Sequence, residues 1–205
     1  QRRHGRPPSV VSPEAPSVTA LVCTGCGAVA DGLLPLRCPN ATSGDGADHV
    51  LTWPRPDVSA GDPDRFARDL AEDPHPFIRY RRFLRVWSAA RAAGLSDDEY
   101  ARTVRELDAA VARVEGRGFS VTPCAPSAPL GARLGLGEDG LIVKDDTGNV
   151  GGSHKARHLF GLALAFETAA RAGHPEAALR DRPLAIASCG NAALAAAVVA
   201  RAMER

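Results

Sequence analysis

The sequence predicts an α/β protein in which parallel-sheet β-α-β-α units follow a helical pair and a small cysteine-rich ribbon. Three observations lead to this fold class. Apolar residues recur at spacings of three and four between 62 and 115, strand-like and helix-like segments alternate after 140, and three cysteines stand among glycines and prolines before 60. Strands that alternate with helices are typical of parallel sheets with right-handed crossovers.

Composition and periodicity divide the chain into four segments. The first is rich in proline, serine and arginine, which is typical of flexible polypeptide. Short β-like pieces such as HVLTW at 49–53 accompany the cysteines, and helical periodicity replaces them further on. We therefore expect a disordered leader at 1–20, a cysteine-rich ribbon at 21–60, a helical pair at 61–118 and the N-terminal, truncated part of a cofactor-binding α/β domain at 119–205.

Two local signals mark the boundary between the paired helices. Gly94 is expected to end the first helix, because glycine adopts the left-handed conformation that closes helices. Ser96, with Glu99 three residues later, has the pattern of a capping box, in which each side chain binds the backbone of the other residue. The second helix should therefore begin directly after Ser96.

The composition excludes several classes of protein. Of 205 residues 44% are hydrophobic and 24% charged, the net charge is +1, and no apolar run reaches the roughly 18 residues of a spanning helix. Interleaved charges give no electrostatic reason to expect nucleic acid or a membrane surface as a partner. The five cysteines do not resemble a secreted disulfide framework, because their number is odd and they cluster towards one end. We expect a cytoplasmic location.

Lysine is rare in this chain. Of its 25 lysines and arginines, only Lys144 and Lys155 are lysines. A guanidinium group stays protonated, whereas a lysine amine can lose its proton and condense with a carbonyl. Either two lysines remained by chance, or an amine is needed at one of these positions.

The C-terminal alternation places Lys155 and Asn191 in equivalent loops. LIVK at 141–144 is a predicted buried strand, followed by the loop DDTGNVGGS and a helix that begins near His154. The same order then repeats: LAIAS at 184–188 is a second predicted strand, followed by the turn CGN and a second helix. Loops at the carboxyl ends of parallel strands lie at one edge of the sheet, where ligands bind. Free amides where the second helix starts favour a carboxylate. Alternatively, Asn191 simply caps a helix and Lys155 is a surface residue.

The stretch PLGARLGLGEDGLIVKDDTGNVGGSHKARHLFGLAL, together with IASCGNAALAAA, resembles the fold-type II pyridoxal-phosphate enzymes. This family includes threonine synthase, threonine and serine dehydratases, cysteine synthase and the tryptophan synthase beta chain. The resemblance covers roughly residues 120–205 and rests on two motifs in the family's order. It implies pyridoxal 5'-phosphate as cofactor and a small amino acid as substrate.

The resemblance also implies roles for individual residues. Lys155, within a Ser-x-Lys setting that begins at Ser153, would bind the cofactor covalently and act as the general base. Asn191 would donate a hydrogen bond to the ring oxygen of the cofactor, and His154 would lie near its phosphate. The loop formed by Ser188, Cys189 and Gly190 would receive the substrate carboxylate.

The implied reaction is Cα deprotonation of an amino acid followed by β or γ elimination or replacement, with the cofactor as electron sink. A threonine synthase-like lyase is the leading expectation, and a serine or threonine ammonia-lyase is the alternative. The family's glycine-rich phosphate loop and the residue facing the pyridine nitrogen come later than these motifs. We therefore expect these 205 residues to hold only half of the cofactor site and to be inactive alone. The complete enzyme is expected to form a homo-oligomer.

The cysteines before residue 60 form a second constellation. Cys23 and Cys26 have a zinc-knuckle spacing, Cys38 follows 12 residues later, and His49 could complete a tetrahedral set. A second Cys-x-x-Cys pair is missing, so free cysteines are the alternative to structural zinc. Some threonine synthases resemble this chain in having a cysteine-rich N-terminal ribbon. A further alternative for the whole chain is a non-catalytic zinc-ribbon and α/β module that binds a partner.

Overall fold

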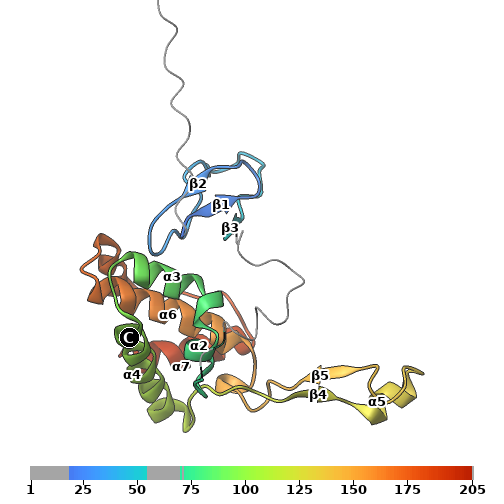
Figure 1. The fold of residues 1–205 in the computed structure, drawn as a ribbon. Coiled ribbons are helices and arrows are strands. Elements are labelled where there is room, and N and C mark those ends of the chain that lie inside the picture. Colours follow the sequence, from blue (N-terminus) through green and yellow to red (C-terminus); the bar gives the residue numbers. More distant parts are fainter. Residues whose placement is uncertain (1–18, 55–69, 71, 205) are drawn as a thin grey trace, which may run out of the picture.

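The computed structural model describes residues 19–54, 70 and 72–204, which form a cysteine-rich ribbon, a helical body and a projecting hairpin (Figure 1). The leader expected at 1–20 lies almost entirely outside the described residues. Most of the stretch 55–69, which the sequence assigned to the end of the ribbon and the start of the helical pair, lies outside them too.

The ribbon is a small antiparallel sheet with strand order β2-β1-β3. Val22 pairs with Val29 on one side and with Thr52 on the other. Each strand has only two or three residues, since glycines and prolines interrupt the β-like pieces. The bounds are β1 (Leu21–Cys23), β2 (Val29–Ala30) and β3 (Leu51–Thr52).

The helical body is built around α6, which packs against α3, α4 and α7. Tyr100 and Phe160 are fully buried, and the Tyr100 hydroxyl donates to the backbone oxygen of Phe77 at 3.1 Å. The Phe160 ring lies 4.7 Å from Phe77 and 4.6 Å from Phe119, so aromatic contacts join the helices at their centre. The bounds are α2 (Pro76–Arg79), η1 (Arg81–Phe83), α3 (Arg85–Ala92), α4 (Asp97–Glu115), η2 (Val150–Gly152), α6 (Lys155–Arg171), η3 (Pro175–Asp181) and α7 (Asn191–Ala202).

The helix boundary signals of the sequence are confirmed. Gly94 follows α3 with a φ of 92°. The Ser96 hydroxyl accepts from the Glu99 amide at 3.2 Å, and the Glu99 carboxylate accepts from the Ser96 amide at 2.7 Å. Helix α4 begins at the next residue and ends before Gly116, which is left-handed.

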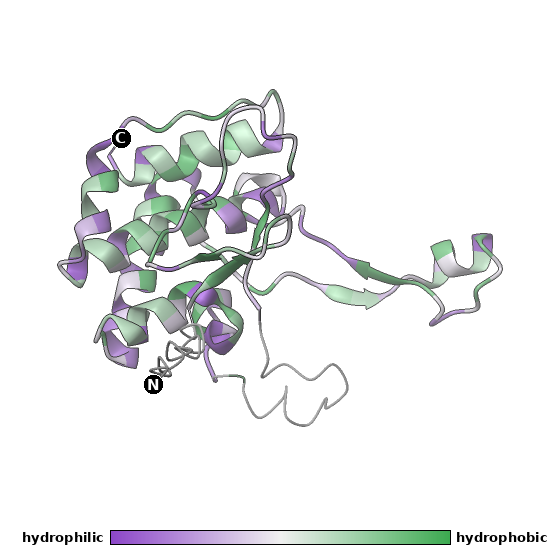
Figure 2. Ribbon diagram, turned by 90° about the horizontal axis from the view of Figure 1, so that it is seen from above, coloured by the Kyte–Doolittle hydropathy of each residue, from purple (hydrophilic) through white to green (hydrophobic). Residues whose placement is uncertain are grey.

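A two-stranded hairpin projects from the helical body (Figure 1). β4 (Cys124–Pro126) pairs antiparallel with β5 (Ile142–Lys144), and α5 (Ala128–Arg133) lies at its tip. Figure 2 shows that much of this arm is hydrophobic although it stands away from the helices. Ile142 is 65% exposed.

Three polar side chains fix the base of the hairpin. Arg157, in the first turn of α6, donates to the Thr122 hydroxyl at 3.0 Å and to the Asp146 carboxylate at 3.2 Å. The Thr122 hydroxyl donates to the same carboxylate at 2.5 Å. This network joins both strands of the hairpin to the start of α6.

The prediction of a parallel sheet of β-α-β-α units is wrong. The described strands form only small antiparallel sheets. β5 does form within the predicted 141–144 run, but its partner is β4, which turns back locally, and the pair projects away from α7. The segment 184–188 has no strand partner, and Leu184 and Ile186 are about half exposed. A short apolar run becomes a strand only where another strand supplies its hydrogen bonds, and β5 pairs with β4 instead.

None of the helices in the described part of the chain combines the length and the apolar composition that crossing a bilayer requires.

Candidate functional site

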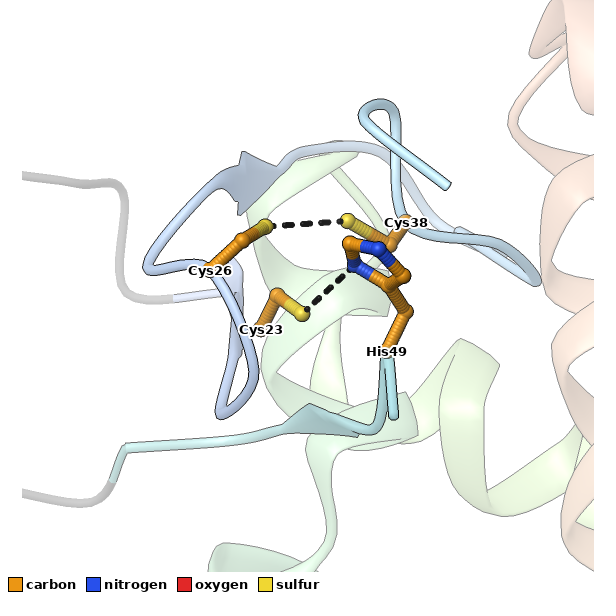
Figure 3. A group of neighbouring side chains, drawn as sticks. All are labelled: Cys23, Cys26, Cys38 and His49. Atoms are coloured by element: carbon orange, nitrogen blue, oxygen red, sulfur yellow. Dashed lines mark hydrogen bonds between the residues drawn. The ribbon is translucent and has the colours of Figure 1, made fainter. Parts of the chain in front are cut away.

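Four side chains of the ribbon converge on one point (Figure 3). Cys23 comes from the end of β1, Cys26 from the turn that follows, Cys38 from the next loop and His49 from the approach to β3. Their potential ligand atoms all lie within 4.8 Å of one another. The structure therefore brings together all four residues that the sequence nominated for a metal.

Two glycines shape the turn that presents the first two cysteines. The Gly27 amide donates to the Cys23 carbonyl at 2.8 Å, and Gly27 has a φ of 71°, which side-chain-bearing residues rarely adopt. A Cβ on Gly25 would overlap the backbone oxygen of Asp48. Glycine at this position lets the segment that carries His49 pass close to the cysteine turn.

The separations within the cluster suit a tetrahedral metal ion. Cys26 Sγ lies 3.6 Å from Cys38 Sγ, and Cys23 Sγ lies 3.4 Å from His49 Nδ1. Zinc bonds of about 2.3 Å to sulfur and about 2.0 Å to nitrogen put neighbouring ligand atoms roughly 3.5–3.8 Å apart. The cluster can hold a metal ion such as zinc.

The electrostatics of the cluster favour a thiolate at Cys23. Burial raises the pKa of the Cys23 thiol, but hydrogen bonds from the Cys26 amide, from His49 and from the Gly25 amide outweigh it and lower the pKa to about 6. The pKa of His49 is raised, chiefly by its hydrogen bond to Cys23. Burial raises the pKa of Cys38. Metals bind thiolates, so Cys23 is the ligand best prepared before binding.

Asp45 orients the histidine and was missed in the sequence. Its Oδ2 lies 3.0 Å from His49 Nε2, which leaves Nδ1 turned towards the cysteines. Hydrogen bonds from the backbone amides of Thr42 and then Ala47 lower the pKa of Asp45 to about 2. A carboxylate on the outer nitrogen of a ligating histidine fixes the ring and its tautomer. The four-residue spacing between Asp45 and His49 was the available signal.

The second set of nominated residues lies at the start of α6. Lys155 is the first residue of the helix, and its amide donates to the Ser153 hydroxyl at 3.4 Å. Lys155 and His154 are exposed, and Ser153 is partly exposed. No hydrogen bond or ion pair within the described residues involves the Lys155 ammonium group. Lys144, by contrast, donates to the Thr122 carbonyl at 2.6 Å.

The third set lies at the start of α7. Ser188, Cys189 and Gly190 are exposed, and the Gly190 amide donates to the Ser188 hydroxyl at 3.3 Å. Gly190, not Asn191, occupies the N-cap, and no side chain caps the helix. The amides of Asn191 and Ala192 make no hydrogen bond within the described residues, as expected for a helix start.

The 3-10 turn η2, which precedes α6, packs on α7. Gly151 is left-handed, with a φ of 64°, and a Cβ at this residue would lie 3.9 Å from Ala195 Cα, one turn into α7. Lys155 comes four positions after Gly151, and Ala195 comes four positions after Asn191. The loop that leads to Lys155 therefore packs on the N-terminal half of α7, which begins at Asn191, and the contact is made by helix packing instead of by the expected parallel sheet.

Comparisons with models of known protein families, with curated proteins and with solved structures found no match to this chain.

Proposed function

We propose that this chain supplies the lysine and asparagine of a pyridoxal-phosphate-dependent lyase that acts on an amino acid. The packing of η2 on α7 carries the proposal, because it brings the loop that leads to Lys155 against the helix that begins at Asn191. An accessible amine and a helix start with free amides are the groups that an aldehyde cofactor and a carboxylate substrate require.

The chemistry of these groups suits the cofactor. The Lys155 amine is exposed and can attack an aldehyde, and the Asn191 side chain is exposed and can donate a hydrogen bond to a ring oxygen. The uncapped start of α7 can bind a carboxylate beside Gly190. When bound, pyridoxal phosphate accepts the electrons that Cα deprotonation releases. Lys155 would be the residue that takes that proton.

A labelling experiment tests the proposal, because the chain has only two lysines. The purified protein is incubated with pyridoxal phosphate and reduced with borohydride, and the modified peptide is identified by mass spectrometry. We expect modification at Lys155, and loss of the visible absorption of the bound cofactor in Lys155→Arg. Lys144→Arg is the matched control and should keep both signals, since the Lys144 amine already donates to a backbone carbonyl.

Equal modification of the two lysines, or an unchanged spectrum in Lys155→Arg, would refute the lyase proposal. Assays with phosphorylated homoserine and with threonine or serine, run on a protein that also carries the glycine-rich phosphate loop, then separate the two candidate reactions. Threonine formation supports a threonine synthase-like lyase, and release of ammonia with a 2-oxo acid supports an ammonia-lyase. A protein that binds the cofactor at neither lysine would leave the non-catalytic module as the better account.

We further propose that the ion held by the ribbon is zinc and that its role is structural. All four coordination positions would be filled by protein, which is typical of structural sites and leaves no position for a substrate. The support is the donor set of three thiols and one imidazole at tetrahedral spacing.

Metal analysis of the purified protein tests the zinc proposal. We expect about one zinc ion per chain, with loss of the ion in Cys26→Ser. Cys124→Ser is the matched control, because Cys124 is exposed on β4, outside the cluster. Equal zinc content in the two variants would show that the ion is bound elsewhere.

A further inference from the structure

Asn149 is a buried polar residue in the loop that leads to Lys155. Its side chain is 1% exposed, and its Nδ2 donates to the Ser153 carbonyl at 2.6 Å. The backbone carbonyl of Asn149 accepts a hydrogen bond from the Gly152 amide at 2.9 Å. Backbone and side chain of one residue thus close the loop 149–153 on itself.

The closed loop is also held from outside. The Glu115 carboxylate, at the end of α4, accepts from the Gly151 amide at 3.0 Å. Val150 is fully buried, and Gly151 packs on α7. Gly151 and Gly152 are both left-handed, at φ values of 64° and 63°. Glycine adopts this conformation without steric strain, so the two glycines allow the tight turn that the hydrogen bonds then hold.

We propose that Asn149 is a positioning residue for Lys155, an inference that rests on the proposed lyase function. Ser153 is where the two hydrogen bonds meet: its carbonyl accepts from Asn149, and its hydroxyl accepts from the Lys155 amide. Fixing this residue fixes the direction in which the backbone enters α6. The conformation of the loop therefore sets where Lys155 begins the helix, next to the contact of Gly151 with α7.

The amide group is specifically required. Asn149 Oδ1 is buried and has no hydrogen-bond partner, so the donating nitrogen accounts for the polar contact of this side chain. Asn149→Ala removes the donor. Asn149→Asp keeps the shape but turns a carboxylate oxygen towards the Ser153 carbonyl, and a buried acceptor facing an acceptor is unfavourable.

The experiment measures the rate at which pyridoxal phosphate is trapped on Lys155 by borohydride. We expect Asn149→Ala and Asn149→Asp to slow trapping at least about tenfold, as a displaced reactive group would. Thr168→Ala is the matched control: Thr168 is 1% exposed, its hydroxyl is unpartnered, and it lies in the same helix far from Lys155. A normal rate in Asn149→Ala, or an equal loss in Thr168→Ala, would overturn the proposal.

The pH dependence of Asn149→Asp distinguishes positioning from general destabilisation. A protonated aspartic acid carries one O–H donor and can restore the hydrogen bond to the Ser153 carbonyl. The ratio of the trapping rate in Asn149→Asp to that in the wild type should therefore rise as the pH falls. A ratio that stays constant or falls with decreasing pH would contradict the assigned role.

A cofactor-independent measurement separates this proposal from the lyase proposal. Amide hydrogen exchange over 150–156 should accelerate about tenfold or more in Asn149→Ala, and the Thr168→Ala variant should match the wild type there. If wild-type Lys155 is never trapped but this exchange difference appears, the lyase proposal fails and the loop-fixing role of Asn149 stands. Unchanged exchange at 150–156 in Asn149→Ala would overturn that role.

Discussion

His49 is held at both of its ring nitrogens. Nδ1 faces Cys23 Sγ at 3.4 Å, and Nε2 faces the Asp45 carboxylate at 3.0 Å. The carboxylate can accept a hydrogen bond from Nε2–H, and in this tautomer the Nδ1 lone pair is available to a metal ion. Asp45 thus acts on the metal through His49, without being a ligand.

Asp45→Asn should weaken zinc binding by about 10–100-fold, the usual effect of losing a carboxylate behind a ligating histidine. The neutral side-chain amide of the introduced asparagine lacks the negative charge that favours a hydrogen bond from His49 Nε2–H. The dissociation constant is measured by competition with a chromogenic chelator. Asp48→Asn is the matched control, because Asp48 lies in the same loop and its side chain makes no hydrogen bond within the described residues. Equal affinities in the two variants would exclude the orienting role.

At the residue scale, the sequence identified the metal ligands but not the residues that orient the site. The grouping of Cys23, Cys26, Cys38 and His49 is confirmed, because ligand types at knuckle spacing form a local pattern. Asp45 and Asn149 act through side-chain hydrogen bonds whose partners depend on loop conformation. Aspartate and asparagine are common in loops for many reasons, so their types alone did not point to these roles.

The capping box is the best-defined helix start of the helical body. Ser96 and Glu99 satisfy each other's backbone amides at the start of α4. Hydrogen bonds from the Ser96 amide and then the Ser96 hydroxyl lower the pKa of the Glu99 carboxyl. A folded-state pKa below the unfolded value means that the ionised form of Glu99 stabilises the fold.

Ser96→Ala should lower the free energy of unfolding by about 1 kcal/mol, as is typical for loss of an N-cap. Glu99→Gln should destabilise the protein at pH 7, and the difference from the wild type should disappear as the pH falls through the lowered pKa of Glu99. Urea unfolding at pH 7 and at pH 3 measures both effects.

Asp98→Asn is the control for the charge at this helix start. Asp98 stands in the same first turn, but its carboxylate makes no hydrogen bond within the described residues. Like Glu99, Asp98 places a negative charge near the helix N-terminus, but unlike Glu99 it does not cap a backbone amide. If Asp98→Asn and Glu99→Gln show the same pH dependence, the capping box does not explain the stabilisation.

At the element scale, helices were predicted better than strands. The helix expected to begin near His154 is α6, which begins one residue later, and the second helix, expected after the turn CGN, is α7. Helices satisfy their own backbone, so periodicity and local signals locate them. The strand expected at 184–188 did not form and β5 paired antiparallel, because strand pairing depends on partners that no local pattern specifies.

At the scale of the whole molecule, Arg85 joins the ribbon to the helical body. Its guanidinium donates to three backbone carbonyls, those of Thr19 at 2.8 Å, Leu33 at 2.7 Å and Gly32 at 2.5 Å. Glu176 adds a contact from η3 by accepting from the Leu34 amide at 2.8 Å. Two charged side chains of the body therefore hold the stretch between β2 and Cys38.

Arg85→Lys should lower the free energy of unfolding by about 1.5–3 kcal/mol, because an ammonium group cannot reach three carbonyls as the guanidinium fork does. Hydrogen exchange at 31–34 should accelerate, whereas the zinc content should not change, because the ligands lie within the ribbon. Arg113→Lys is the matched control, since Arg113 is exposed on α4. Unchanged exchange at 31–34 in Arg85→Lys would show that the ribbon is attached by other contacts.

The hairpin of β4 and β5 and the helical body differ in stability, and each can unfold independently of the other. Its strands contact chiefly each other, and the Thr122, Asp146 and Arg157 network is the hinge that joins it to α6. Two-stranded hairpins are marginal in water, so this arm can open and re-form many times during the life of one folded helical body. Mild denaturant should therefore barely change amide exchange in the arm, and proteases should cut there first and leave a folded core.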